Sequence, residues 1–289
     1  MLTAMVTPMT SEGAVDYAGA ARLADYLVTQ MRNDGLVISG TTGESPTTTD
    51  AEKDRLLRTV IEAVGGRARV VAGVGTNDTA HTCELARRAE QAGADALLVV
   101  TPYYNKPPQN GLLAHFTAAA DATGLPVMLY DIPGRTGVPI KTETLIQLAQ
   151  HPRIVAVKDA KGDMTAASLV MTATDLAFYS GDDVVNLPWL SIGACGFVSV
   201  VGHVVGDRLA EMINAYLSGD VSTAVRLHRD MLPVFVGIMT RTQGVITTKA
   251  ALAMLGMPGG PVRPPLANAT DAEVEQLRAD LVAGGVKLR

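Results

Sequence analysis

The chain has 289 residues and a formal net charge of -5, from 24 Lys and Arg against 29 Asp and Glu. This acidic balance argues against nucleic acid as a main partner, because binding it requires a basic surface. Apolar residues make up 47% and charged residues 18% of the chain, so burial can offset the entropy of ordering and disorder is excluded. At roughly 150 residues per domain, the length fits one large domain or two smaller ones.

Cysteine usage and hydropathy indicate the compartment. Cys83 and Cys195 are too few for a disulfide framework, and neither belongs to a paired-cysteine metal motif. A secretory signal begins with basic residues, and no basic residue precedes Arg22. No apolar run approaches the ~18 residues of a spanning helix. We therefore expect a cytoplasmic protein with no membrane partner.

Eight short, β-rich apolar runs recur along the chain, with helical patterns between them. These runs cover residues 4–7, 36–39, 70–74, 96–100, 127–130, 154–157, 177–180 and 197–201. Several are apolar at successive positions, which is typical of parallel strands covered on both faces. Eight strand–helix units without a dinucleotide-binding glycine fingerprint predict an α/β fold, a closed (β/α)8 TIM barrel.

Two capping boxes mark helix starts, Thr49 with Glu52 and Thr270 with Glu273. The strand pattern stops near residue 219, and helices are predicted at 221–238, at 245–255 and from the second capping box to about 283. The predicted domains are therefore a catalytic barrel over 1–219 and a C-terminal helical domain over 220–289.

Active sites of such barrels lie at the carboxyl ends of the strands, where Lys158 follows the run 154–157. If its side chain enters the barrel interior, desolvation lowers its pKa, and the neutral amine can form a Schiff base with a ketone. On the residues alone, the commoner arrangement is a strand-end lysine that reaches water or pairs with Asp159.

Three other strand ends carry polar groups that allow two interpretations each. The GTTGES turn at 40–45 could present backbone N–H groups to a carboxylate, or could be a glycine turn closed by its own hydrogen bonds. Tyr130 could relay protons beside the amine, or simply pack. Tyr103 and Tyr104 could form a subunit contact, and Arg135 could bind a second carboxylate or lie exposed.

Metal and hydrolase chemistry have no support in the sequence. The five histidines are scattered without ligand spacing, and no GxSxG motif occurs. We therefore expect chemistry without a cofactor and without a metal.

The motifs GTTGES, VTPYYNKPPQ and YDIPGRTG, with the lysine of IVAVKD, occur in this order at successive strand ends. In this combination the chain resembles the dihydrodipicolinate synthases of the pyruvate-dependent class I aldolase superfamily, over essentially its whole length. The resemblance implies condensation of pyruvate with L-aspartate-4-semialdehyde to 4-hydroxy-tetrahydrodipicolinate, on the route to diaminopimelate and lysine, by a cytoplasmic homotetramer.

The resemblance also implies roles for particular residues. Lys158 would form the imine, Thr42 and Thr41 would hold the pyruvate carboxylate through backbone N–H groups, and Tyr130 would move protons. The hydroxyl of Thr41 and Tyr104 of a neighbouring subunit would complete the proton relay. The remaining pocket residues implied by the resemblance are Arg135, which would bind the semialdehyde carboxylate, and Gly181, Asp182 and Val198, which would line the pocket.

Some positions depart from the pattern of relatives inhibited by lysine. A glutamate that grips the inhibitor is replaced by His81, and histidines of the helix after the GTTGES turn are replaced by Asp50 and Lys53. Lys53 would repel a lysine ligand, so we expect weak or absent feedback inhibition. His203 replaces an asparagine after the eighth strand, with no predicted consequence.

Two alternatives remain open from the sequence. A pyruvate-dependent aldolase for sugar acids, such as N-acetylneuraminate or 2-keto-3-deoxygluconate, would share the imine chemistry and would generally lack an arginine at position 135. A catalytically silent barrel that binds pyruvate or serves in assembly would not need the full set of Lys158, Tyr130, Thr41 and Tyr104.

Overall fold

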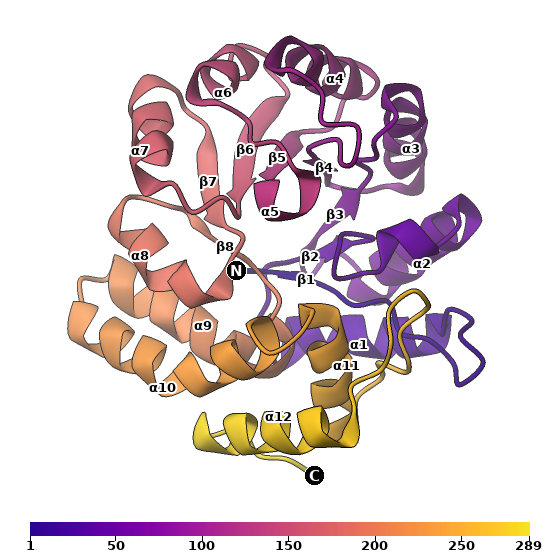
Figure 1. The fold of residues 1–289 in the computed structure, drawn as a ribbon, viewed down its shortest axis with the longest axis vertical. Coiled ribbons are helices and arrows are strands. Elements are labelled where there is room, and N and C mark those ends of the chain that lie inside the picture. Colours follow the sequence, from indigo (N-terminus) through magenta and orange to yellow (C-terminus); the bar gives the residue numbers. More distant parts are fainter. The chain divides into compact units, whose positions relative to one another are not determined.

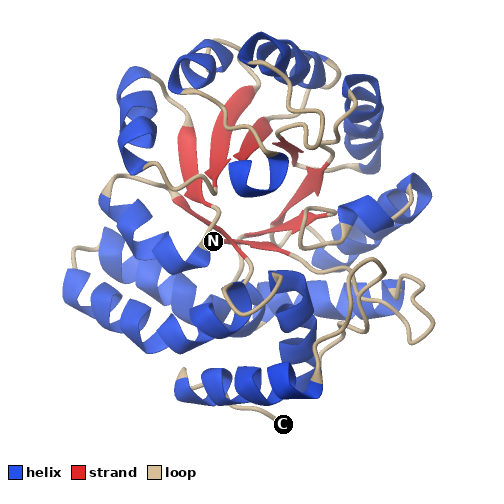
Figure 2. Ribbon diagram, viewed as in Figure 1, coloured by secondary structure: helices blue, strands red, loops and turns tan.

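The structure, a computed structural model, describes residues 1–289 and contains eight parallel strands in a closed barrel, in the order β1 to β8 (Figures 1 and 2). The strands are β1 (Leu2–Ala4), β2 (Gly35–Ile38), β3 (Arg69–Gly73), β4 (Ala96–Val100), β5 (Val127–Asp131), β6 (Ile154–Asp159), β7 (Ala177–Ser180) and β8 (Gly196–Ser199). The predicted TIM barrel is therefore confirmed. Its strands are short and nearly all buried, which explains their apolar runs.

Six strands differ from the predicted limits by one to three residues, and the contacts of β1 and β6 account for two of these differences. β1 ends at Ala4, three residues before the predicted limit, because the backbone N–H of Val6 donates to the side chain of His203 instead of continuing a ladder. β6 continues two residues beyond its predicted end, with Lys158 paired to Tyr130 and Asp159 to Asp131 of β5. The lysine thus lies on the strand itself.

Helices fill most of the connections between the strands (Figure 1). They are α1 (Tyr17–Thr29), η1 (Ser45–Thr47), α2 (Asp50–Val64), α3 (Thr79–Ala92), α4 (Gln109–Asp121), α5 (Pro133–Thr136), α6 (Thr142–Leu148), α7 (Met164–Ala173), η2 (Asp183–Val185), α8 (Asn186–Ser191), α9 (Gly202–Leu217), α10 (Val221–Met239), α11 (Gly244–Met254) and α12 (Asp271–Ala283). Both predicted capping boxes are present, at the starts of α2 and α12. The predicted C-terminal helices are confirmed.

The chain forms two compact units, residues 1–69 with 198–289, and residues 70–197. Within the first unit α1 packs on α2, α10 packs on both α9 and α12, and α9 contacts β1. Within the second unit β4 to β7 pair in sequence, and α4 packs between α3 and α6. The division into a barrel over 1–219 and a helical domain over 220–289 stays a prediction.

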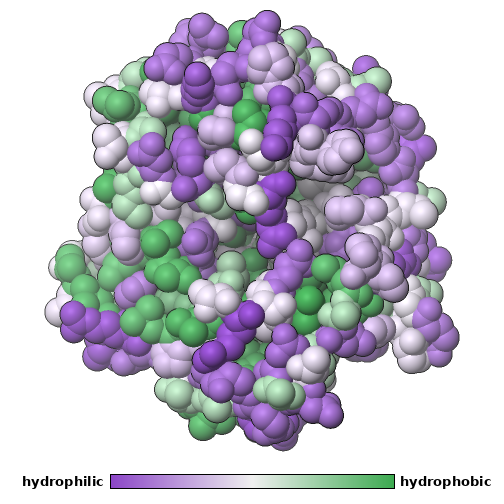
Figure 3. All heavy atoms as spheres, viewed as in Figure 1, coloured by the Kyte–Doolittle hydropathy of each residue, from purple (hydrophilic) through white to green (hydrophobic).

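Each unit has its own apolar core. In the first, Leu23, Leu27 and Phe235 are fully buried, and in the second Trp189 stacks on Phe178 with 6.2 Å between ring centroids. Figure 3 shows apolar side chains gathered over the α9 and α10 pair, where Leu217 is 70% exposed. None of the helices combines the length and the hydrophobicity required of a membrane-spanning segment.

Candidate active site

Lys158 is buried with 3% of its surface exposed, near the carboxyl end of β6, where it pairs with β5 and β7. Its Nζ lies 4.1 Å from the centroid of the Tyr130 ring, the residue opposite it in register on β5. Burial lowers the pKa of Lys158 to about 8, the charge of Asp183 opposes this shift and the charge of Arg135 adds to it. An amine of this kind is partly neutral near pH 7 and can act as a nucleophile.

The alternative pairing of Lys158 with Asp159 does not occur. Asp159 accepts hydrogen bonds from the backbone N–H groups of Lys161 and Gly162, at 2.8 and 2.9 Å. Its carboxylate therefore closes the turn after β6, and the lysine is left beside the aromatic ring.

Gly181 packs against the side chain of Lys158 and leaves space for it because it has no Cβ atom. A Cβ atom at this position would lie 3.0 Å from Cγ and 3.1 Å from Cε of Lys158, and 3.0 Å from the carbonyl oxygen of Asp159. These distances are shorter than most contacts of real Cβ atoms, so a larger residue would require the lysine to shift by a few tenths of an ångström. The neighbouring Asp182 is half-buried and uses its carboxylate to accept from the N–H of Val184 at the start of η2.

Asp183 is a buried acidic residue beside the lysine that the sequence analysis did not identify. It is 1% exposed, accepts a hydrogen bond from the side chain of Asn186 at 2.9 Å and exerts the attraction on Lys158 described above. A signal was present, since an aspartate pair stands one residue after the strand end at Ser180. The fold was needed to bring one member of that pair near the amine.

A second polar group, missed from the sequence, holds the segment after β5. Asp131 is fully buried, accepts from the N–H of Ile140 at 3.2 Å and pairs with Lys161 at 3.3 Å. Burial raises the pKa of Asp131 to about 6, against the opposing charge of Lys161. The segment fixed in this way carries α5, with Arg135 in its only turn.

Tyr104 points away from its own chain. It is 89% exposed and its φ of 74° is unusual for a residue with a side chain. The same loop is tied down by Asn105, whose side chain donates to the carbonyl of Asn77 at 2.8 Å. Tyr103, by contrast, is partly buried, and this burial raises its pKa.

The GTTGES turn lies in the other compact unit, directly after β2. It is closed by backbone bonds from Gly43 to Gly40 and from Glu44 to Thr41, and the hydroxyl of Thr7 donates to the carbonyl of Gly43 at 2.6 Å. Thr42 is buried and Thr41 is partly exposed. Glu44 has φ 55°, a left-handed conformation that favours glycine.

His203 joins β1 to the end of β8. Its Nε2 accepts from the N–H of Val6 at 3.0 Å, and its Nδ1 lies 2.7 Å from the carbonyl of Val200. These partners require a proton on Nδ1 and none on Nε2. Burial lowers the pKa of His203 to about 4, so the ring is neutral and structural. Val198, in the same region, is fully buried on β8 and pairs with Leu2.

The predicted site residues thus fall into two groups. Within residues 70–197 the structure brings Lys158 against Tyr130 and Gly181, with Arg135 close enough to act on the lysine charge. Thr41, Thr42 and Val198 belong to the other unit and are described only within it.

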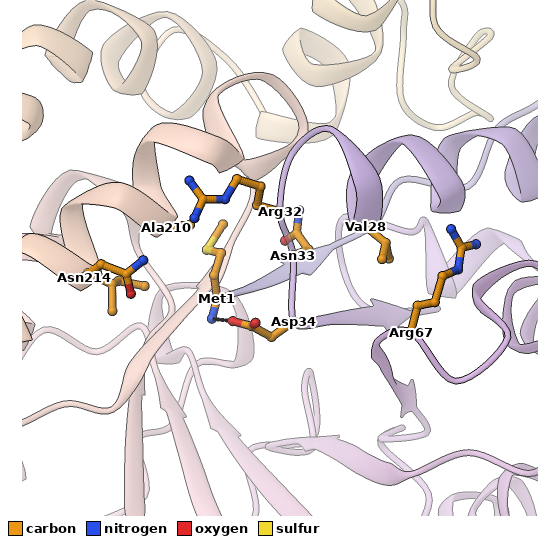
Figure 4. A pocket seen from close by; sticks show the side chains of 9 residues that line it. Met1, Val28, Arg32, Asn33, Asp34, Arg67, Ala210 and Asn214 are labelled. Atoms are coloured by element: carbon orange, nitrogen blue, oxygen red, sulfur yellow. Dashed lines mark hydrogen bonds and ion pairs between the residues drawn. The ribbon is translucent and has the colours of Figure 1, made fainter.

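A separate hollow in the first unit contains none of these residues (Figure 4). Its wall includes Arg32 and Arg67, and the Met1 nitrogen donates to Asp34 at 2.7 Å. Arg67 is paired with Asp25 at 2.7 Å. Asp34 is thus held by the Met1 amine and Arg67 by Asp25.

Comparisons with known proteins agree with the motifs. The model of the dihydrodipicolinate synthetase family matches residues 1–283. The 4-hydroxy-tetrahydrodipicolinate synthase of Acidothermus cellulolyticus is 68% identical over 285 residues, covering 99% of this chain and 92% of that protein. A synthase of the same name from Streptomyces coelicolor is 65% identical over 288 residues, covering 100% and 96%.

Among solved structures, DHDPS from Cyanidioschyzon merolae with lysine bound is similar with a TM-score of 0.95 and 43% identity, covering 98% of this chain and 97% of that chain. The similarity therefore extends over the barrel and the C-terminal helices alike. On these matches, the chain belongs to the dihydrodipicolinate synthetase family.

Proposed function

We propose that this chain condenses pyruvate with L-aspartate-4-semialdehyde through a Schiff base on Lys158, giving 4-hydroxy-tetrahydrodipicolinate. The observation that carries this proposal is a buried amine, held against Tyr130, whose pKa is lowered to about 8. The names of the most similar relatives support this synthase over an aldolase for sugar acids.

In the first stage of the proposed reaction, the neutral Nζ of Lys158 attacks the ketone carbon of pyruvate. Loss of water leaves a protonated imine, which draws electrons from the adjacent methyl group and makes it acidic. We assign the proton transfers of this stage to Tyr130, and the support is its ring beside the Nζ of Lys158. Because a phenol is uncharged, it does this without putting a fixed charge beside the cationic imine.

In the second stage the methyl carbon loses a proton, and the resulting enamine attacks the aldehyde carbon. The amine of the semialdehyde then attacks the imine carbon, closes the ring and releases Lys158 with its original protons. One water leaves and no electrons are gained or lost, so the reaction needs neither a cofactor nor a metal.

Recognition of the two carboxylates is assigned to different residues. We assign the pyruvate carboxylate to the backbone N–H groups of Thr41 and Thr42, and the semialdehyde carboxylate to the guanidinium of Arg135, which offers a planar pair of donors. Gly181, Asp182 and Val198 are assigned to the lining of the pocket. The tight contact of Gly181 with the lysine supports its part in this assignment.

We further propose a cytoplasmic homotetramer in which Tyr104 completes the proton relay of a neighbouring subunit with Tyr130 and the hydroxyl of Thr41. The support is the exposure of the Tyr104 side chain, which leaves it accessible to a neighbouring subunit. Sedimentation measurements test the assembly. A fully active monomer would contradict this part of the proposal.

Pyruvate trapping tests the proposed function. The protein is incubated with pyruvate and borohydride, digested, and the modified peptide is located by mass spectrometry. We expect one adduct, on Lys158, and product formation in a coupled assay when semialdehyde is added. An unmodified Lys158 would contradict the proposal. An adduct on Lys158 in an enzyme that does not use semialdehyde would favour the aldolase for sugar acids.

A further inference from the structure

A buried ion pair outside the proposed catalytic groups ties the GTTGES turn to the C-terminal helices. Glu44, the fifth residue of the turn, and Lys249 of α11 have side chains that are 1% and 3% exposed. Nζ of Lys249 lies 2.5 Å from Oε1 of Glu44 and also donates to the carbonyl of Pro261 at 2.7 Å. Both residues belong to the same compact unit.

The second oxygen of Glu44 is also held from the C-terminal segment. Oε2 accepts the backbone N–H of Arg263 at 2.8 Å, between residues 219 positions apart in the chain. The guanidinium of Arg263 donates to the carbonyls of Gly13 and Thr47, at 2.8 and 2.7 Å, and to Glu52 at 2.6 Å. The turn and the following helix start are therefore fixed on both sides.

These contacts offset the conformational strain of the turn. Glu44 stands in the left-handed region with φ 55°, as does Ser39, the residue before the turn, with φ 59°. A residue with a Cβ adopts this conformation only where its surroundings demand it. Here the surroundings do so, because the buried carboxylate of Glu44 is held by the ammonium of Lys249 and the backbone N–H of Arg263. Separating Glu44 from Lys249 would leave a buried charge uncompensated.

We propose that the Glu44–Lys249 pair is a positioning device for the backbone N–H groups of Thr41 and Thr42, and so determines the affinity for the pyruvate carboxylate. This inference rests on the proposed function. Glu44 is bonded directly to Thr41 through its own backbone N–H at 3.1 Å, so a rotation at Glu44 is transmitted to the turn. The C-terminal helices thereby act on substrate binding without contributing a catalytic residue.

The test is the double variant Glu44→Gln with Lys249→Met, which removes both charges and retains an acceptor for Arg263. Replacing a buried ion pair by neutral groups of similar volume is often tolerated, so the fold should remain. We expect the KM for pyruvate to rise about 10-fold, since small displacements of binding groups are costly. The KM for semialdehyde and the final extent of borohydride trapping at saturating pyruvate should stay as in the wild type.

A matched control removes another ion pair of the C-terminal helices. Nε of Arg241 lies 2.7 Å from Oδ2 of Asp280, and both residues are far from the turn in the sequence. The variant Arg241→Met with Asp280→Asn should leave the KM for pyruvate unchanged. If both double variants raise this KM equally, or if the KM values of both substrates rise together, the positioning role is refuted.

Failure of the double variant to fold can be distinguished from failure of the proposed function. If the Glu44/Lys249 double variant does not fold, Lys249→Gln, which keeps a donor beside Glu44 and Pro261, is measured instead and should raise the KM for pyruvate about 3-fold. An unchanged value in the folded variant overturns the inference. If the wild type itself forms no pyruvate adduct, the proposed function fails first, independently of this pair.

Discussion

Two buried lysines, one in each compact unit, show how a fold gives the same side chain opposite tasks. Lys249 and Lys158 are both 3% exposed, and burial lowers the pKa of both. Lys249 has the carboxylate of Glu44 at 2.5 Å, which stabilises the ammonium, whereas Lys158 has the ring of Tyr130 beside it. The contacting carboxylate favours the protonated form of Lys249, whereas burial without such a contact lowers the pKa of Lys158 to about 8.

The largest effect should come from Lys158→Met. Because this substitution removes the nucleophile, we expect kcat/KM to fall at least about 10³-fold and borohydride trapping of pyruvate to disappear. Lys249→Met serves as the matched control and should still form the adduct at Lys158 in its folded fraction. Trapping of pyruvate at another lysine in the Lys158 variant would contradict the assignment of Lys158 as the nucleophile.

The same substitution should change stability in opposite directions at the two positions. Lys249→Met leaves Glu44 buried without its partner and should lower the free energy of unfolding by about 3–5 kcal/mol. Lys158→Met removes an amine that is costly to bury and should raise the free energy of unfolding by about 3 kcal/mol at pH 7. Urea denaturation of both variants measures the two changes.

The pH dependence of the second change follows from the pKa values. Lys158 has a folded pKa of about 8 against 10.5 in the unfolded chain, so the unfolded state binds the additional proton between these values. The wild type therefore gains stability as the pH rises from about 8 to 10.5, and the advantage of the Met variant should vanish there. An advantage that persists at pH 10.5 would mean that it comes from packing instead.

Arg135→Leu should reduce kcat/KM for semialdehyde about 10²-fold, because charge-assisted hydrogen bonds to its carboxylate are lost. Pyruvate trapping should remain complete, which separates recognition of the second substrate from formation of the imine. Equal use of semialdehyde by the variant would contradict the assignment and favour an aldolase of another specificity.

A smaller effect is expected on the pH profile of the first step. The rate of pyruvate trapping should rise with pH through about 8, as Lys158 becomes neutral. The charge of Arg135 contributes to lowering this pKa, so Arg135→Leu should move the rising limb to higher pH. A limb that stays in place would show that burial alone sets the pKa.

The smallest effect concerns a third lysine, Lys53, whose side chain is 14% exposed and lies 3.7 Å from Asp50. Its charge, together with His81 in place of a glutamate, should keep free lysine from binding as a feedback inhibitor. We expect little inhibition of the condensation in a titration with lysine. Half-inhibition at submillimolar lysine would contradict this expectation.

Local pattern was sufficient for the fold. The apolar runs gave eight strands because parallel strands buried on both faces must be apolar at successive positions, and the capping boxes at Thr49 and Thr270 gave two helix starts to the residue. The limits of six strands, β1, β2, β3, β5, β6 and β8, were wrong by one to three residues. Those of β1 and β6 depend on the bond from Val6 to His203 and on the pairing of Lys158 with Tyr130.

The amino-acid sequence by itself determined the barrel, and by resemblance it named Lys158 and the residues proposed to act with it. The tertiary structure was needed to show which buried lysine contacts a carboxylate and which lies against a tyrosine ring. The physical reason is that a pKa depends on the groups within a few ångströms, and those of Lys158 and Lys249 come from distant parts of the chain. The contacts of Asp183, Asp131 and Glu44 could not be predicted for the same reason, because the sequence around each residue does not identify its partners.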